Sequence, residues 1–133
     1  MSGISDLTPQ ELGLLQAALD LAREGQTDAL RAQLEAGLPV DLTNSVGDTL
    51  LILAAYHDHP DTVRLLLDHG ADHSRVNDRG QTALGSAVFR RSAATVRALL
   101  DAGADPDHGG RSARQVAEFF ELTEMQALLH REG

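Results

Sequence analysis

A thirty-three-residue period runs through this chain of 133 residues, and it constrains the fold more than any other feature. Glycines and leucines recur at that interval, at Gly37, Gly70 and Gly103 and at Leu34, Leu67 and Leu100. The segment NSVGDTLLILAAYHDHPDTVRLLLDHGAD matches the later segment NDRGQTALGSAVFRRSAATVRALLDAGAD. Self-similarity at a fixed period of this length is typical of a repeat architecture, in which stacked copies of one small module share a continuous core.

Each copy has the pattern of a turn, a short helix, a reversal and a second helix. Asn44–Gly47 and Asn77–Gly80 have the residue types of tight turns, with a glycine free to adopt positive φ. Thr49 and Thr82 stand where an N-cap would begin a helix. Pro60 suits the first turn of a second helix, where a missing N–H costs nothing. The pattern predicts a mostly α-helical solenoid of about four helix-turn-helix units with short β-hairpin or turn fingers.

The two ends of the chain differ from its middle. Thr8 and Glu11 form a capping box that opens a first helix, but the register of Gly47 holds Leu14, so the first finger is missing. Thr123 and Gln126 are a second such pair. We therefore expect an N-terminal tail at 1–8, an N-terminal capping repeat at 9–43, repeats at 44–76 and 77–109, and a C-terminal capping repeat at 110–133.

Composition favours a folded domain. Hydrophobic residues make up 42% and aromatic residues only 3%, so the core must consist of Leu, Ala and Val. Cysteine is absent, which excludes disulfides and thiolate metal sites. The first ten residues contain no basic start and no apolar run, so we expect no secretory leader, and no run approaches the about 20 apolar residues of a membrane span. We expect a cytoplasmic monomer.

The charge of the chain limits the classes of partner. Its net charge is -9, and all eleven basic residues are arginine. Nucleic acids and anionic membranes need a positive surface, so we expect neither as a partner. A basic protein surface would be attracted.

The repeats GDTLLILAAYHDHPDTVRLLLDHGAD and GQTALGSAVFRRSAATVRALLDAGAD resemble ankyrin repeats, whose pattern is G-x-T-P-L-x-x-A-A-x-x-G-x-x-x-x-V-x-x-L-L-x-x-G-A-D. The resemblance covers about residues 9–131 and is nearest to small free-standing bacterial ankyrin proteins. The family's Thr-Pro-Leu-His reads TLLI at 49–52 and TALG at 82–85, and its glycine between the helices is Asp58 or Arg91. The resemblance implies an accessory or regulatory protein that is no enzyme and binds a protein client through its concave face and finger loops.

The same resemblance places candidate partner-binding residues. Tyr56, Phe89 and Phe119 follow the paired small residues of the first helices and lie nine residues after Gly47, Gly80 and Gly110, so their rings should form a ladder. The ladder is either a contact stripe or part of the packing. The other candidates flank it in the fingers and at the helix ends: Ser45, Val46, Asp48, His57, Asp78, Arg79, Gln81 and Arg90. The arginines among them suit an acidic or aromatic partner segment, or only keep the surface solvated.

The best metal-like cluster is His57-Asp58-His59 with nearby Asp61. Two histidines two residues apart can reach one ion from an extended loop, but this segment lies in the reversal between helices, where such residues serve as caps. We expect no metal and no cofactor. A metal-binding protein or hydrolase that uses His57 and His59 is the alternative. An inhibitor or immunity-type protein that masks a basic partner is a second alternative. The sequence contains none of the short catalytic motifs HExxH, GxSxG, GxxxxGK[ST] or GxGxxG.

Overall fold

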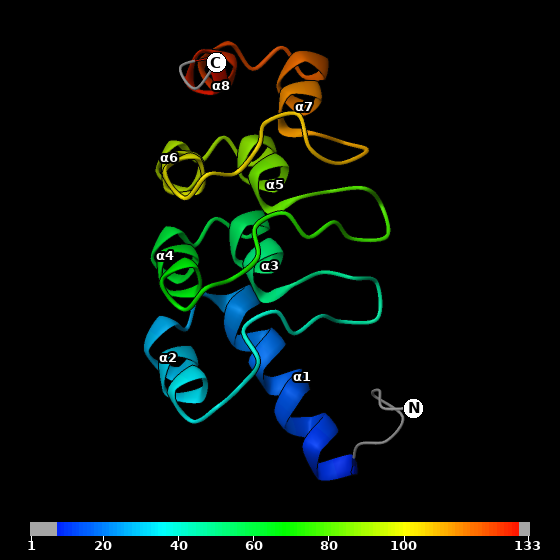
Figure 1. Cartoon of the computed structure of the whole chain (residues 1–133), viewed down its shortest axis with the longest axis vertical. Coiled ribbons are helices and arrows are strands. Elements are labelled where there is room, and N and C mark those ends of the chain that lie inside the picture. The colour runs from blue at the N-terminus through cyan, green and yellow to red at the C-terminus, as the bar shows by residue number, and fades with distance from the viewer. Residues whose placement is uncertain (1–7, 131–133) are drawn as a thin grey trace.

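The computed structural model describes residues 8–130 as a stack of helix pairs in two layers (Figure 1). Eight helices are assigned in this part of the chain: α1 Pro9–Glu24, α2 Thr27–Glu35, α3 Leu50–Tyr56, α4 Pro60–Asp68, α5 Ala83–Phe89, α6 Ala93–Asp101, α7 Ala113–Phe119 and α8 Thr123–His130. The odd-numbered helices form an inner layer and the even-numbered helices an outer layer. The main contacts join the two helices of a pair or neighbouring helices of one layer. The predicted α-helical solenoid is confirmed.

Hydroxyl caps begin the inner helices. The side chains of Thr49, Thr82 and Ser112 accept hydrogen bonds from the third backbone N–H of α3, α5 and α7. Thr8 and Glu11 form the predicted capping box of α1, with Pro9 at the first helical position. These polar groups satisfy donors that a short helix leaves unpaired at its start. The helix starts at these four positions are therefore encoded locally.

Equivalent apolar residues fill the interior between the two layers. Leu51 and Leu84 are buried in the inner layer, and Leu66 and Leu99 are buried in the outer layer. Gln33 shares their outer-layer register, but its side chain is exposed on α2. Because α2 is the first outer helix, the face that a further helix would cover is left to solvent. The polar residue therefore marks the end of the stack.

The reversals between the paired helices keep one backbone shape without glycine. Asp58, Arg91 and Glu121 have φ values of 61°, 58° and 53°, in the left-handed region. Asp58 and Arg91 stand where the ankyrin pattern has glycine. A left-handed conformation costs a non-glycine residue about 1–2 kcal/mol. Asp58 and Arg91 in place of glycine therefore keep the same backbone conformation in the reversals, but at a cost in free energy.

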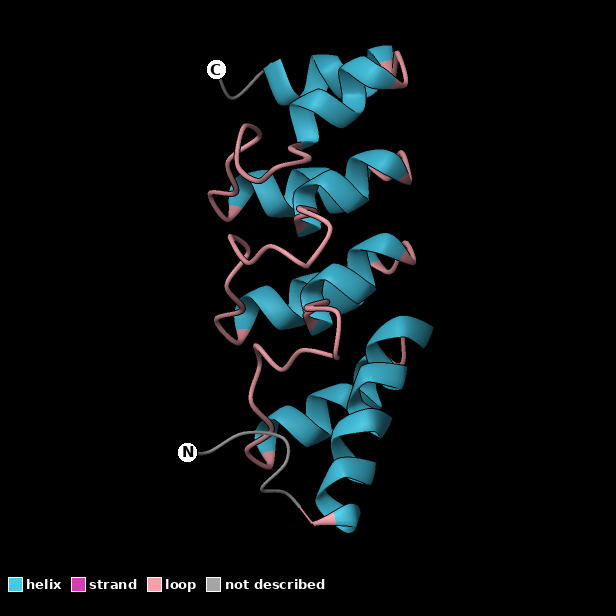
Figure 2. Ribbon diagram, turned by 90° about the vertical axis from the view of Figure 1, so that its right-hand side faces the viewer, coloured by secondary structure: helices cyan, strands magenta, loops and turns pink. Residues whose placement is uncertain are grey.

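The fingers before α3, α5 and α7 project from one side of the stack (Figures 1 and 2). They consist of turns and isolated bridges, between Thr43 and Thr49 and between Gln81 and Arg111, and the described part of the chain contains no β-strand. Of the hairpin or turn fingers that we expected, the described residues therefore contain turns. In the fingers before α3 and α5, the side-chain oxygens of Asn44 and Asn77 each accept from two backbone N–H groups and supplement the backbone hydrogen bonds of the turn.

Two expectations about the ends need comment. The second capping box is wrong, because Thr123 lies inside α8 and the amide of Gln126 donates to the carbonyl oxygen of Ala117 at 3.1 Å. The predicted tail falls almost wholly on residues 1–7, and the capping repeat at 110–133 ends on residues 131–133; both stretches lie outside the described residues. The repeat boundaries between them stay predictions.

Candidate functional site

Two adjoining cavities lie between the inner helices and the fingers. One has a volume of 330 Å³ and a mostly polar lining that includes Arg23, Asp48 and Arg79. The other has a volume of 260 Å³ and a mostly apolar lining that includes Phe89 and Phe120. Both cavities are also lined by the same four residues, Tyr56, Gln81, Ser86 and Arg111. Because they share a wall, we treat them as one site and call it the concave groove.

Aromatic rings form one edge of the concave groove. The rings of Tyr56 and Phe89 are stacked, with centroids 6.0 Å apart and planes 3° from parallel. The ring of Phe120 meets that of Phe89 edge to face, at 5.5 Å between centroids. Tyr56 is 38% exposed and Phe89 is 43% exposed, so each ring is partly packed and partly free to contact a ligand. This geometry suits both the contact and the packing interpretations of the ladder.

The structure differs from the expected ladder at its third ring. Phe119 is the last residue of α7, as Phe89 is of α5, yet Phe120 takes the place beside Phe89. Residues just after the helix end lean toward the preceding repeat, since the guanidinium of Arg90 likewise lies 6.0 Å from the centre of the Tyr56 ring. Phe119 is 78% exposed and lines neither cavity. Its role as a partner contact stays a prediction.

The fingers are tied together by side chains that also shape the groove. The amide of Asn77 donates to a carboxylate oxygen of Asp48, in the neighbouring finger, at 2.8 Å. The Asn77 Oδ1 atom accepts from the backbone N–H groups of Arg79 and Gln81, at 3.0 and 2.9 Å. The backbone N–H of Asp78 donates to the carbonyl oxygen of Val46 at 3.0 Å. These bonds link the two fingers, in a chain that has Ile52 and Gly85 at the histidine position of the family's Thr-Pro-Leu-His.

The predicted finger residues therefore fall into three groups: one that supports the groove, two that line it, and three that are exposed outside it. Asp48 is buried, with its carboxylate occupied by asparagine amides, so it supports the groove and is poorly placed for direct contact. Arg79 and Gln81 line the groove. Ser45, Val46 and Asp78 are exposed on the fingers but line neither cavity.

Two groove residues were missed that the repeat register could have found. Arg111 follows Gly110 as Gln81 follows Gly80, and it lines both cavities. Arg23 lies thirty-three residues before Tyr56 and lines the polar cavity. Both positions follow from applying the period to the capping repeats as strictly as to the central ones.

The two histidines of the metal-like cluster lie in different surroundings. The Nε2 atom of His59 is 2.9 Å from the carbonyl oxygen of Arg23, and its ring fills the space above Gly25, where a Cβ would lie 2.4 Å from Nδ1. His57 lines the polar cavity and meets the Tyr56 ring edge to face. No group of three or more His, Asp or Glu residues within 8–130 is arranged to hold a metal ion. His59 thus serves to join α1 to the reversal before α4.

Burial and nearby positive charges both affect the pKa of His57. Partial burial lowers the pKa of His57 below its ordinary value of 6.5, and the nearby charges of Arg23, His59 and Arg90 lower it further. Asp48 opposes them and raises the pKa. Burial and the three nearby cations both lower the pKa of His57, and together they outweigh the opposing effect of Asp48.

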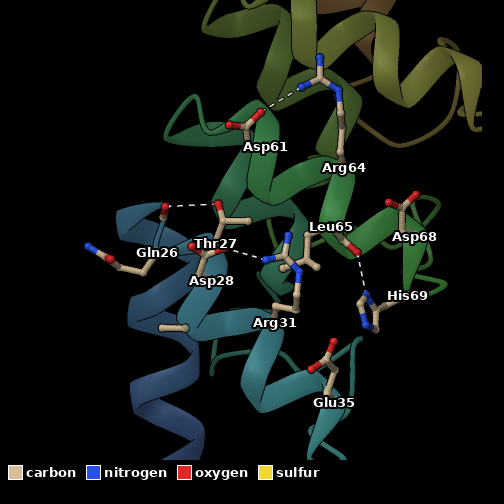
Figure 3. Close-up of a pocket in the computed structure, with 12 residues that line it drawn as sticks. Gln26, Thr27, Asp28, Arg31, Glu35, Asp61, Arg64, Leu65, Asp68 and His69 are labelled. Carbon is tan, nitrogen blue, oxygen red and sulfur yellow. Dashed lines mark hydrogen bonds and ion pairs between the residues drawn. The ribbon is translucent and has the colours of Figure 1, made fainter.

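A second hollow, of 680 Å³, lies between α2 and α4 on the outer layer (Figure 3). We call it the helix-side cleft. Its arginines are paired within their own helices: Arg31 Nη1 lies 2.6 Å from Asp28 Oδ1, and Arg64 Nη1 lies 3.2 Å from Asp61 Oδ1. Glu35 and Asp68 add further negative charge to its walls. The cleft is therefore acidic and its cations are already neutralised.

Comparison with known proteins agrees with this architecture. A family model of ankyrin repeats, in three copies, matches residues 14–109. This chain belongs to the ankyrin-repeat family. The ankyrin-repeat assignment is supported by a Pseudomonas aeruginosa protein named for its ankyrin repeats, which is 46% identical over 57 residues. That match covers 43% of this chain and 32% of the relative, so the chain spans about a third of the relative's length.

Ankyrin repeats are generally protein–protein interaction modules and typically have no enzymatic activity. The family therefore points to a protein as the ligand class of this ankyrin-repeat chain. None of the helices described in residues 8–130 has the length and apolar character needed to cross a bilayer.

Proposed function

We propose that this ankyrin-repeat chain binds a segment of a partner protein in the concave groove and works as an accessory or regulatory protein in bacteria. The observation that supports this most is the groove itself, in which a polar and an apolar cavity adjoin along a line of half-exposed aromatic rings. Rigid aromatic side chains are enriched among the residues that dominate binding energy at protein interfaces.

The walls of the groove are ordered before any partner arrives. The buried Asn77–Asp48 bond fixes two fingers, and the backbone N–H of Arg111 donates to the carbonyl oxygen of Gly80 at 2.9 Å, which fixes the third. A preorganised surface loses little conformational entropy on binding. The structure therefore suits a ligand that fits a fixed surface.

The experiment is affinity capture from native lysate, with the wild-type chain compared with a Tyr56→Ala, Phe89→Ala double variant. We expect the double variant to lose the captured partner, because removing a binding hot spot costs about 2 kcal/mol or more of binding free energy. Removing each half-exposed ring should lower the free energy of unfolding by less than the about 3–5 kcal/mol that removal of a fully buried ring costs. The variant should therefore remain folded.

Leu14→Ala is the matched control, since Leu14 is 59% exposed on α1 and lines neither cavity. It should capture the partner as the wild type does. Equal capture by the double variant, folded by circular dichroism, would contradict the proposal. The expectations of a cytoplasmic monomer and of an inhibitor that masks a basic partner stay predictions.

A further inference from the structure

The charge of the concave groove is opposite to that of the chain as a whole. The chain carries a net charge of -9, yet three arginines, Arg23, Arg79 and Arg111, and one carboxylate, Asp48, line the polar cavity. A cationic groove on an anionic molecule attracts anionic groups locally while the rest of the surface repels extended polyanions.

Two of these arginines have no carboxylate partner in the described part of the chain. Five arginines at other positions form ion pairs, Arg23 among them, but neither Arg79 nor Arg111 lies within 4.0 Å of a carboxylate oxygen of residues 8–130. Their backbones are nevertheless fixed, because the N–H of Arg79 donates to Asn77 and that of Arg111 donates to Gly80. Anchored backbones thus carry guanidinium groups that remain available to a ligand.

The carboxylate in the groove does not neutralise them. One oxygen of Asp48 accepts from the Asn77 amide at 2.8 Å, and the other accepts from the Asn44 amide at 3.3 Å. Asp48 is only 8% exposed. Its lone pairs are committed to the fingers, so the guanidinium groups of Arg79 and Arg111 keep their capacity to bind a carboxylate in pairs of hydrogen bonds.

The apolar cavity adjoins these guanidinium groups. Arg111 lines both cavities, and Phe89 and Phe120 line the apolar one. Gly85 also lines this cavity, at the position of Ile52 in the preceding repeat, and it lets Arg111 approach closely, since a Cβ there would lie 3.2 Å from the carbonyl oxygen of Arg111. A volume of 260 Å³ accommodates one large apolar side chain. An acidic and an apolar group of one short segment can therefore be bound side by side.

We propose that the concave groove recognises a partner segment in which an Asp or Glu residue lies beside a large apolar residue. The side-chain carboxylate binds Arg79 and Arg111, and the apolar side chain enters the apolar cavity, which Phe89 and Phe120 help to line. This inference rests on the proposed function, because it specifies the chemistry of the segment that the groove binds. A nucleic acid is disfavoured, since its phosphates would be repelled by a chain of net charge -9.

The test is selection of a displayed library of random 12-residue peptides on the whole chain. Selected peptides are then synthesised and titrated by fluorescence polarisation against wild type, Arg79→Gln with Arg111→Gln, and Arg91→Gln with Arg97→Gln. The last variant removes two arginines that form no ion pair in residues 8–130 and line neither cavity. It therefore controls for the change in net charge alone.

We expect the selected peptides to be enriched in Asp or Glu beside Leu, Phe or Trp. Their dissociation constant should rise about tenfold or more for the groove variant and less than about twofold for the control, because charge-assisted hydrogen bonds are lost only in the former. Affinity should also fall as ionic strength rises.

Different outcomes separate this inference from the proposed function. Peptides that lose affinity with Tyr56→Ala, Phe89→Ala but keep it with the groove arginine variant would overturn the acidic segment and leave the binding groove in place. Peptides that are insensitive to both variants would overturn both proposals. A single-stranded oligonucleotide that competes as well as the acidic peptides would overturn the choice of a peptide ligand.

Discussion

The helix-side cleft and the concave groove use arginine in opposite ways. In the cleft, Arg31 and Arg64 each hold an aspartate three residues earlier in the same helix. In the groove, Arg79 and Arg111 have no ion-pair partner among residues 8–130. An ion pair within one helix neutralises the arginine locally, whereas an arginine without a partner can still bind an anionic group of a ligand. The number of basic residues on a surface is therefore a weaker sign of a binding site than their lack of partners.

The helix-side cleft and the concave groove share one hydrophobic core. The largest effect on stability should therefore come from a substitution in that core. Leu66→Ala removes a fully buried side chain of α4 and should lower the free energy of unfolding by about 2–5 kcal/mol. Chemical denaturation followed by circular dichroism measures this, with exposed Leu14→Ala as the control. We expect one transition for both faces. Two separate transitions would show that cleft and groove are independent units.

A smaller effect should distinguish the groove from the cleft. Asn77→Ala leaves the buried carboxylate of Asp48 and the N–H groups of Arg79 and Gln81 without their partner. We expect a loss of about 2–3 kcal/mol in unfolding free energy, because buried polar groups that lose a hydrogen bond are costly. Ser45→Ala, on the same side of the stack but exposed, should change it by less than about 0.5 kcal/mol. A loss no greater than this for Asn77→Ala would show that the fingers are not held by this asparagine.

The ion pairs of the helix-side cleft should contribute still less to the free energy of unfolding. Asp28→Asn and Asp61→Asn each remove one partner of an exposed pair, with side-chain exposures of 95% and 87% for the two aspartates. Each should change the unfolding free energy by about 0–1 kcal/mol, since solvent screens such pairs. Urea denaturation at two salt concentrations is the measurement. A loss above about 2 kcal/mol for either would mean that the cleft pairs are structural and would remove the contrast between the two faces.

The smallest effect concerns pH. Because the pKa of His57 is lowered in the folded chain, the folded state prefers the neutral ring, and its contribution to stability is complete above pH 6.5. As the pH falls below 6.5 the unfolded chain binds the proton first, so that contribution declines. His57→Gln should slightly reduce the loss of stability between pH 7 and pH 5.

The cause of the shift can be tested on the same histidine. In an NMR titration, Arg90→Gln should raise the pKa of His57 toward 6.5, because it removes one of the cations that lower it. Asp61→Asn, in the cleft, should leave it unchanged. A titration curve of His57 that is identical in wild type and Arg90→Gln would show that Arg90 does not act on this ring.

Local sequence signals predicted the helices best where a helix carries its own start or stop. Thr49 and Thr82 cap the helices that they were expected to cap, and Gly70 and Gly103 have the positive φ of a helix end. The thirty-three-residue period predicted how the repeats stack, since equivalent apolar residues must face equivalent neighbours. The fingers were harder to predict in detail, because side-chain hydrogen bonds of Asn44 and Asn77 supplement a few backbone bonds and no strand forms in the described residues.

The site could be predicted only in outline. The register of Tyr56 and Phe89 correctly placed two stacked rings, but the direction of a side chain just after a helix end depends on the neighbouring repeat, which is why Phe120 takes the place expected for Phe119. The bond between Asn77 and Asp48 joins residues twenty-nine positions apart and leaves no local signal. Whether an arginine has a partner likewise depends on three-dimensional distance.

The restriction of the main helix contacts to adjacent units has an evolutionary consequence. Duplication or deletion of one thirty-three-residue module would add or remove one aromatic ring and one finger while the remaining modules keep their surroundings. Descendants of such a chain can therefore lengthen or shorten the recognised segment in whole steps, and they need not redesign the parts that already bind it.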